Sequence, residues 1–416
     1  MYVDNEISEL QKVIVHFPDD GISRISPKRA EGLLFDDIVF YPLMAKEYKA
    51  FLQLLTSFVG ANNVFQIERL IRESIEASDS IKEEVIDRVI EFEQLPLSFE
   101  KYFSNLSSAD LAKTLITGYL KAEDRILFDP IPNYMFTRDI AVTIKDHILI
   151  TRAAKEARFR ENLLSRFIFF RHPMFSDLVT EGRLIDLNDR EKFPPSQRGE
   201  VVNAEGGDIM MFTKDYVLIG ASERTTPYAF NCIRDALFEK DLVKQVVQVT
   251  IPDERSFMHI DTLFTMIDDG LVACHKPIVF DGEGSNVIVH SQDGSTEMFP
   301  SIKEFLISKV NPEMKFVFSG GGISPYQERE QWTDSCNLVA IRPGVAISYD
   351  RNLRTLEEFR AVGYHIMDAE DVFQQLSMDD AYTSRLQKTI ITIPSAELSR
   401  ARGGSHCMTC PILRSA

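Results

Sequence analysis

The sequence repeats one local pattern four times, and this repeat constrains the fold more than any other feature. Each copy begins with an aspartate, continues with a short run of apolar and β-branched residues, and reaches a second such run after a turn. The aspartates are Asp139, Asp208, Asp261 and Asp334. Their spacing exceeds the roughly 20 to 50 residues of common short repeats. The pattern predicts a repeated supersecondary module, although four unrelated hairpins would give the same local signals.

Two strand-like runs joined by a short turn predict a β-hairpin in each copy. The paired runs are 141–144 with 148–150, 209–212 with 216–219, 263–267 with 271–274, and 338–341 with 345–349. Helical patterns at 160–169 and 227–238 follow two of the hairpins, which indicates an α/β protein. If the modules surround a common centre, their leading aspartates converge there.

Residues 66–122 have a different character, because apolar residues recur at helical spacing and strand signals are almost absent. Ser80 with Glu83 resembles a capping box that opens a helix, and Ser107 with Asp110 resembles another helix start. We therefore expect a first α/β part over 1–65, a small helical insertion over 66–122, and the remaining α/β part over 123–416.

The formal net charge of −17 restricts the partners. A surface this negative repels phosphate backbones, so we expect no nucleic-acid partner. It attracts cations, although the charge can also serve solubility alone. The chain lacks an apolar run of about 18 residues, the length that spans a bilayer, and its first residues lack the features of a signal peptide. We expect a cytoplasmic protein without a membrane partner.

The chain has five cysteines, an odd number with scattered spacing, which argues against a disulfide framework and for a reducing compartment. Cys407 follows two glycines that allow close backbone approach. Arg402 and His406 lie near it in sequence and are expected to favour its thiolate. The alternative is a redox or metal pair with Cys410. A structural zinc site needs four ligands, and the chain has no second C-x-x-C pair.

Three further motifs carry groups suited to catalysis. His259 and Asp261 point to one face if they lie on a strand. Glu205 and Asp208 flank two glycines, and the segment Phe-Thr-Arg-Asp ends at Asp139. Each motif alone has an ordinary structural alternative, such as a surface pair or a salt bridge.

Together these motifs resemble the arginine deiminase family, within the guanidino-group-modifying enzymes. The matching segments, in family order, are Leu-Leu-Phe-Asp-Asp at 33–37, Phe-Thr-Arg-Asp at 136–139, Glu-Gly-Gly-Asp at 205–208, Met-His-Ile-Asp at 258–261, Glu-Arg-Glu-Gln-Trp at 328–332, Tyr-Asp-Arg-Asn at 349–352 and the Cys407 tail. The resemblance covers nearly the whole chain. It implies a five-module pseudo-symmetric α/β propeller with an inserted helical domain, whose fifth module joins the N-terminal strand to the Cys407 tail.

The resemblance also implies hydrolysis of free L-arginine to L-citrulline and ammonia through a covalent amidino-thioether, with no metal and no cofactor. Each implied role belongs to a residue that matches the family motif. Cys407 resembles the nucleophile, His259 the general acid/base, Asp139 and Asp261 the carboxylates that clamp the guanidinium, Glu205 the acid beside the histidine, and Asn133, Arg158, Arg224 and Arg402 the group that binds the amino-acid end of the substrate.

The chain departs from the family pattern in a few places. Ser405 stands where many members of the family have glycine, Ile140 follows the Phe-Thr-Arg-Asp motif, and the turn at 334–337 contains less glycine. Two other functions stay open. One is a related guanidine hydrolase, such as an arginine dihydrolase that continues to ornithine. The other is a non-catalytic arginine-binding scaffold. The oligomeric state is open too, with a homo-oligomer among the alternatives.

Overall fold

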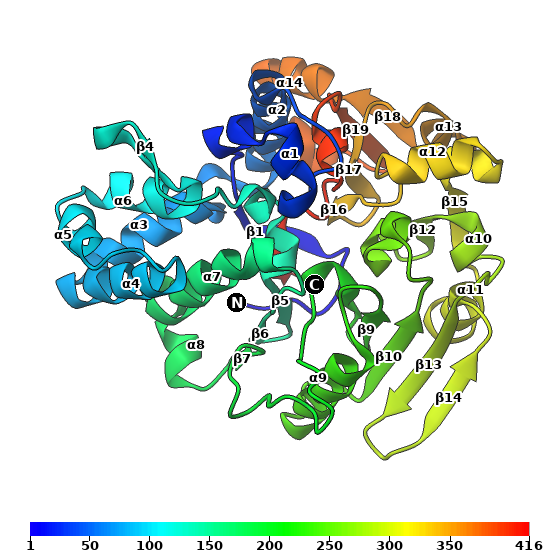
Figure 1. Ribbon diagram of the computed structural model, residues 1–416. Coiled ribbons are helices and arrows are strands. Elements are labelled where there is room, and N and C mark those ends of the chain that lie inside the picture. The colour runs from blue at the N-terminus through cyan, green and yellow to red at the C-terminus, as the bar shows by residue number, and fades with distance from the viewer. Residues whose placement is uncertain (416) are drawn as a thin grey trace.

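The computed structural model describes residues 1–415, which form an α/β protein with five sheets of three or more strands and one short two-stranded sheet (Figure 1). The first sheet contains β1 (Glu9–Val15), β2 (Val64–Gln66) and β20 (Cys410–Ser415); the second β5 (Ala141–Ile144), β6 (His147–Ile150) and β7 (Leu184–Asp186); the third β8 (Ile209–Thr213), β9 (Tyr216–Ala221), β10 (Gln245–Thr250), β13 (Asn286–Ser291) and β14 (Thr296–Phe299); the fourth β11 (Phe264–Asp268), β12 (Leu271–Cys274) and β15 (Lys315–Phe318); the fifth β16 (Val339–Arg342), β17 (Val345–Tyr349), β18 (His365–Asp368) and β19 (Thr389–Ile393); the short sheet β3 (Tyr119–Leu120) and β4 (Arg125–Ile126).

All five larger sheets share one pairing rule: two strands pair antiparallel, and one of them pairs in parallel with a third. In four sheets the antiparallel pair is a hairpin, and these hairpins confirm the four predicted ones. Strands such as β5 and β12 are buried at every position, as expected of strands covered on both faces.

Fourteen α-helices cover the sheets or connect them. They are α1 (Pro27–Ala30), α2 (Tyr41–Val59), α3 (Ile67–Ala77), α4 (Asp79–Phe92), α5 (Ser98–Ser104), α6 (Ser108–Thr117), α7 (Phe159–Arg171), α8 (Ser176–Thr180), α9 (Pro227–Glu239), α10 (Lys276–Val279), α11 (Ile302–Phe305), α12 (Tyr326–Trp332), α13 (Leu353–Ala361) and α14 (Ala369–Met378). Within residues 1–415, none of them is long and apolar enough to cross a membrane.

The predicted helical segment contains α3 to α6, which gather on one side of the molecule in blue to cyan (Figure 1). The expected cap of α4 was wrong by two residues: Ser78, not Ser80, accepts the hydrogen bond from Ile81 N. The helix α4 therefore begins at Asp79, two residues earlier than the capping-box pattern suggests. The second predicted start is confirmed, because the hydroxyl of Ser107 accepts from Asp110 N.

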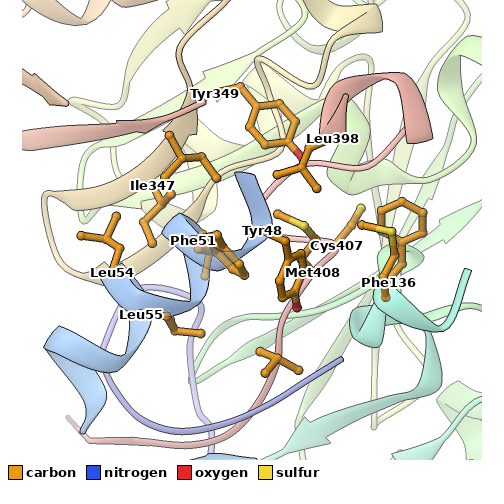
Figure 2. Close-up of a cluster of buried hydrophobic side chains, with 14 of the residues drawn as sticks. Tyr48, Phe51, Leu54, Leu55, Phe136, Ile347, Tyr349, Leu398, Cys407 and Met408 are labelled. Atoms are coloured by element: carbon orange, nitrogen blue, oxygen red, sulfur yellow. The ribbon is translucent and has the colours of Figure 1, made fainter. Parts of the chain in front are cut away.

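The two ends of the chain meet in one sheet. Strand β1 pairs antiparallel with β20, with Ile14 opposite Cys410. This pairing holds the catalytic candidate Cys407 directly before the last strand. Figure 2 shows Cys407 and Met408 beside Phe136, at the edge of a buried apolar cluster that also contains Tyr48 of α2.

Candidate active site

All predicted site residues except Asp261 line one cavity. Asp261 lies immediately beside it, with its Oδ2 3.4 Å from the Sγ of Cys407. The cavity lining consists of Leu34, Asn133, Phe136, Asp139, Arg158, Glu205, Arg224, Arg255, Met258, His259, Thr262, Ala401, Arg402 and Cys407. Residues from seven separated segments therefore come together, and of the four leading aspartates Asp139 lines the cavity.

Hydrogen bonds connect the turns that carry these residues. Asp139 Oδ1 accepts from Gly207 N (3.1 Å), and Asp208 Oδ1 accepts from Ile260 N (3.0 Å). The next links run from Asn337 Nδ2 to Asp261 O (3.0 Å), from Cys407 N to Asn337 Oδ1 (3.0 Å), and from Arg138 N to Cys407 O (3.0 Å). Since Arg138 adjoins Asp139, the links form a closed belt through the turns of all five larger sheets. The belt fixes the nucleophile candidate relative to the acids.

Glycine is required where this belt is tightest. A Cβ on Gly207 would lie 2.5 Å from Nδ1 of His259 and 3.0 Å from Oδ1 of Asp261. A Cβ on Gly404 would lie 2.4 Å from the backbone oxygen of Asn337. Such contacts are shorter than any side chain tolerates, so these glycines allow the functional groups to approach one another.

His259 begins a 3-10 turn and is not on a strand, so the expected strand placement was wrong. The turn nevertheless brings the imidazole to two carboxylates: Nε2 lies 2.9 Å from Oε2 of Glu205, and Nδ1 lies 3.9 Å from Oδ1 of Asp139. Burial lowers the pKa of His259, but the carboxylates of Asp139, Glu205 and Asp208 outweigh it and raise the pKa to about 10. The imidazole is therefore protonated at neutral pH and is poised to donate a proton.

The surroundings of Cys407 oppose ionisation in the absence of substrate. Burial raises the pKa of its thiol well above the ordinary value, and the carboxylates of Asp261, Asp139 and Asp334 raise it further. The charge of Arg402 does interact with Cys407, as expected, but burial and the three carboxylates outweigh it, and the side chain of His406 is held by two carboxylates.

The guanidinium of Arg402 lies over the ring of Trp332, 3.3 Å from the centroid, and donates to the Trp332 carbonyl. His406 bridges two carboxylates, with Nδ1 2.9 Å from Asp261 Oδ2 and Nε2 3.1 Å from Glu6 Oε2. The imidazole of His406 therefore holds the Asp261 carboxylate by the same oxygen, Oδ2, that the thiol of Cys407 approaches.

Arg158 forms ion pairs inside the cavity. Its Nη1 lies 2.5 Å from Oδ2 of Asp139 and 3.5 Å from Oε2 of Glu205, and its Nε donates to Glu161 (2.8 Å). Burial lowers the pKa of Arg158, but these three carboxylates raise it well above its usual value. The guanidinium of Arg158 is thus bound to Asp139, one of the two carboxylates predicted to clamp the guanidinium of the substrate. The space left inside the cavity measures only about 30 Å³.

Three buried polar atoms around the cavity have no hydrogen-bond partner within residues 1–415: Asp261 Oδ1, Arg224 Nε and Arg402 Nε. Buried polar groups are usually paired, so these three atoms are available to a bound ligand. The acceptor lies beside Cys407, and the donors belong to residues predicted to bind a carboxylate. Asn133 lines the cavity as well, although its Nδ2 donates to the carbonyl of Leu33 (2.8 Å).

Asp139, Glu205 and His259 also have one donor atom each within 4.8 Å of one another, the arrangement that a metal ion needs. Arg158 already places a cation against both carboxylates. A metal ion would have to displace this guanidinium and take a proton from His259.

Sequence reasoning missed two groups at this site. Asn337 holds the backbone of Cys407, and Glu6 holds His406. Neither belongs to a motif with recognisable chemistry, and both act on residues far away in the sequence. The only signal was the position of Asn337 just after the fourth repeated aspartate, Asp334.

Comparisons with known proteins agree with this geometry. The family model described as arginine deiminase matches residues 31–414. The arginine deiminase of Mycoplasma capricolum is 31% identical over 428 residues, which cover 99% of this chain and 96% of the relative. That of Listeria monocytogenes is 30% identical over 439 residues, covering 99% and 97%. That of Limosilactobacillus reuteri is 29% identical over 440 residues, covering 100% and 98%.

Among solved structures, a mutant of DDAH from Pseudomonas aeruginosa complexed with citrulline superimposes with a TM-score of 0.50 at 13% identity, covering 97% of this chain and 99% of that one. This likeness supports the fold alone. The family model and the relatives extend over nearly the whole chain, and they include the segments that build the cavity. The chain belongs to the arginine deiminase family.

Proposed function

We propose that this protein hydrolyses the guanidinium of free L-arginine to give L-citrulline and ammonia, with Cys407 as the nucleophile. One observation carries the proposal: a single buried cavity brings the Cys407 thiol together with the His259–Glu205 pair and two further carboxylates. Cysteine is a strong nucleophile for a resonance-stabilised carbon, and histidine is the usual proton carrier.

Substrate binding supplies the charge that activates the thiol. Asp139 and Asp261 accept hydrogen bonds from the guanidinium, with the unpaired Oδ1 of Asp261 as one acceptor. Three carboxylates raise the pKa of Cys407 in the free enzyme. A cation bound between the thiol and these carboxylates offsets their effect and lowers that pKa, so the thiolate forms when the substrate is present.

The reaction then proceeds in two halves. The thiolate attacks the central guanidinium carbon, protonated His259 gives its proton to one nitrogen, and ammonia leaves. A cationic amidino-thioether remains on Cys407. Neutral His259 next removes a proton from water, and the resulting hydroxide adds to the same carbon. The carbon–sulfur bond breaks, the thiolate returns, and citrulline leaves after its extra proton passes to solvent.

The amino-acid end of the substrate is assigned to Asn133, Arg158, Arg224 and Arg402. The cavity of about 30 Å³ is too small for arginine, so binding requires Arg158 to leave Asp139. Its guanidinium can then pair with the substrate carboxylate, while the substrate guanidinium takes its place on Asp139. Bidentate contacts suit guanidinium and carboxylate partners in both arrangements.

We also propose that the five larger sheets form a pseudo-symmetric propeller, with residues 66–122 inserted between 1–65 and 123–416. The support is the shared pairing rule and the closed belt of hydrogen bonds. Limited proteolysis at the ends of the insertion would test these domain boundaries. A cytoplasmic location is proposed because the five cysteines are free thiols, which suits a reducing compartment.

Incubation with L-arginine, with citrulline, ornithine and ammonia all measured, tests the activity. One citrulline and one ammonia per arginine support the proposal. Ornithine with two ammonia per arginine would identify a dihydrolase instead. Arginine binding without turnover would identify a binding scaffold.

A further inference from the structure

A second cavity, of about 560 Å³, is lined by four arginines and only one acid, Glu91. It lies where α4 and α7 meet the segments after β6 and β7. We call it the arginine groove and define it by Arg88, Arg152, Arg166 and Arg190. Four cations around one cavity are unexpected in a chain with a net charge of −17, and a random surface patch of this protein would be acidic.

Two of these cations are unpaired. Arg166 donates to Asp186 (2.7 Å) and Arg88 pairs with Glu84 (2.7 Å). Arg152 and Arg190 form no ion pair with any residue of 1–415. Arg152 is half-buried and Arg190 is exposed. Burial and the neighbouring charge of Arg190 lower the pKa of Arg152, and the carboxylate of Asp186 opposes this shift without cancelling it. Two adjacent unpaired guanidinium groups repel one another, and a bound anion would remove this repulsion.

The rest of the lining indicates what the anion is attached to. The rings of Phe92 and Phe159 and the side chain of Leu163 form an apolar part of the wall. Asn162 uses its Oδ1 to accept from Ala153 N (3.3 Å), which leaves its amide donors available. The volume lies in the range of small-molecule sites, but seven of the ten lining residues are polar or charged, which suits an anionic ligand. Planar guanidinium groups suit the oxygens of a phosphate, and they also stack on aromatic rings.

We propose that the arginine groove binds a phosphate-bearing small molecule of nucleotide size. Arg152 and Arg190 hold the phosphate oxygens, and Phe92 and Phe159 contact the apolar or aromatic part. The binding does not depend on the reaction proposed above.

The arginine groove also connects to the active site through the backbone. Arg152 exchanges two backbone hydrogen bonds with Ala204 (3.1 and 3.0 Å), which precedes Glu205. Phe159 adjoins Arg158, the side chain that has to leave Asp139. A ligand in the groove would hold this segment in the closed arrangement, and it would raise the KM for arginine. This coupling, unlike the binding, rests on the proposed function.

The binding is tested by calorimetry on the full-length protein with ATP, AMP, inorganic phosphate and adenosine as probes. ATP or AMP should bind, adenosine should not, and added salt should weaken binding. The variants Arg152→Gln and Arg190→Gln should each weaken binding about tenfold or more, because each removes charge-assisted hydrogen bonds. The control is Arg360→Gln, an exposed arginine of α13 outside the groove that makes the same change in net charge; it should leave binding unchanged.

The arms of the experiment separate the alternatives. Inorganic phosphate binding as tightly as AMP, with the same loss in both variants, would overturn the nucleotide-sized ligand and identify a site for the free ion. Absence of binding by all phosphates at millimolar concentration would overturn the proposal, as would binding that Arg152→Gln and Arg190→Gln leave intact. A dimer that dissociates in Arg190→Gln would also overturn it, because a second copy would then fill the groove. An unchanged KM despite nucleotide binding would reject only the coupling.

Discussion

The side chain of Asn337 links Cys407 to Asp261: its Oδ1 accepts from Cys407 N and its Nδ2 donates to Asp261 O, both at 3.0 Å. Asn337 is 1% exposed, so water cannot replace either bond easily. One amide therefore sets the distance between the proposed nucleophile and a carboxylate that is proposed to hold the substrate guanidinium. Small errors in such distances reduce rates strongly.

Asn337→Ala should lower kcat by about 100-fold and change KM less, because the thiol is displaced while Asp139 and Arg224 keep their partners. Steady-state kinetics over a range of arginine concentrations measure this split. The control is Asn352→Ala, which removes a fully buried asparagine that bonds Thr333 and lines no part of the cavity. It should lower the Tm with little effect on kcat. Equal losses of kcat in Asn337→Ala and Asn352→Ala would show that Asn337 contributes to stability and does not position the thiol.

Cys407→Ala should abolish turnover, and Cys410→Ala should keep most of it. The Sγ of Cys410 is buried against the carbonyl of Ala141, and burial raises its thiol pKa to about 12. Cys410 lines no part of the cavity, so no bound substrate lowers this pKa, and the thiol is unsuited to attack at neutral pH. Citrulline production by both variants, with and without a chelator, is the measurement. Equal loss in the two variants, or inhibition by the chelator, would favour a redox or metal pair.

Free enzyme should react with iodoacetamide at Cys407 only slowly at pH 7, and the rate should increase through pH 9 and above. The sign follows from the pKa of the thiol, which burial and three carboxylates raise, so that the reactive thiolate forms only at high pH. Peptide mapping by mass spectrometry separates Cys407 from half-buried Cys232. The kcat for arginine should not show this increase, since kcat reports the enzyme–substrate complex, in which the cationic substrate is proposed to lower the same pKa. A rate of alkylation that is already maximal at pH 7 would contradict the raised pKa of the free thiol, and with it the need for substrate to lower that pKa.

The sequence predicted the hairpins well because their signals are local. Alternating runs and turns lie within about ten residues of each other, and the structure confirms all four. The leading acids were also recognisable, and Asp139 and Asp261 do meet at Cys407. The α4 cap was misplaced because Ser78 and Ser80 both offer a hydroxyl at a helix start, and helix boundaries are the least certain part of such predictions.

The charge state of Cys407 could not be predicted from its neighbours in the chain. Arg402 and His406 are close in sequence, yet their side chains bind Trp332 and the Glu6–Asp261 pair. The carboxylates that control the thiol come from three separate repeats and approach only after the chain closes. Tertiary contacts of this kind leave no local pattern, which is also why Asn337 and Glu6 escaped notice.

Arg224→Ala should reduce kcat/KM for arginine by about 10- to 100-fold, the loss expected for a hydrogen bond between charged groups. Agmatine lacks the α-carboxylate, so its smaller kcat/KM should fall less. This comparison matters because Arg224 also lies 3.5 Å from Glu205, and damage to the His259–Glu205 pair would harm both substrates equally. Kinetics of the variant with arginine and with agmatine distinguish a loss of carboxylate recognition from damage to the His259–Glu205 pair. Equal losses would remove Arg224 from carboxylate recognition.

His259→Ala should trap the reaction on the enzyme. The pKa of about 10 makes the wild-type imidazole an acid at neutral pH, ready to protonate the departing nitrogen. After ammonia leaves, the same imidazole is neutral and becomes the base for water. Its removal should slow each half by 10²- to 10⁴-fold.

The thiol of Cys407 does not depend on this histidine, because its pKa is set by burial and by three carboxylates. Attack on bound arginine should therefore still occur in His259→Ala, whereas water has lost its only base. Mass spectrometry after incubation with arginine should show Cys407 carrying arginine less ammonia, and the double variant with Cys407→Ala should show no adduct. Without an adduct, slow alkylation of Cys407 relative to the wild type would mean that the thiolate needs His259 after all. Citrulline production near the wild-type rate would exclude His259 from the mechanism, together with this account of how one residue drives both halves.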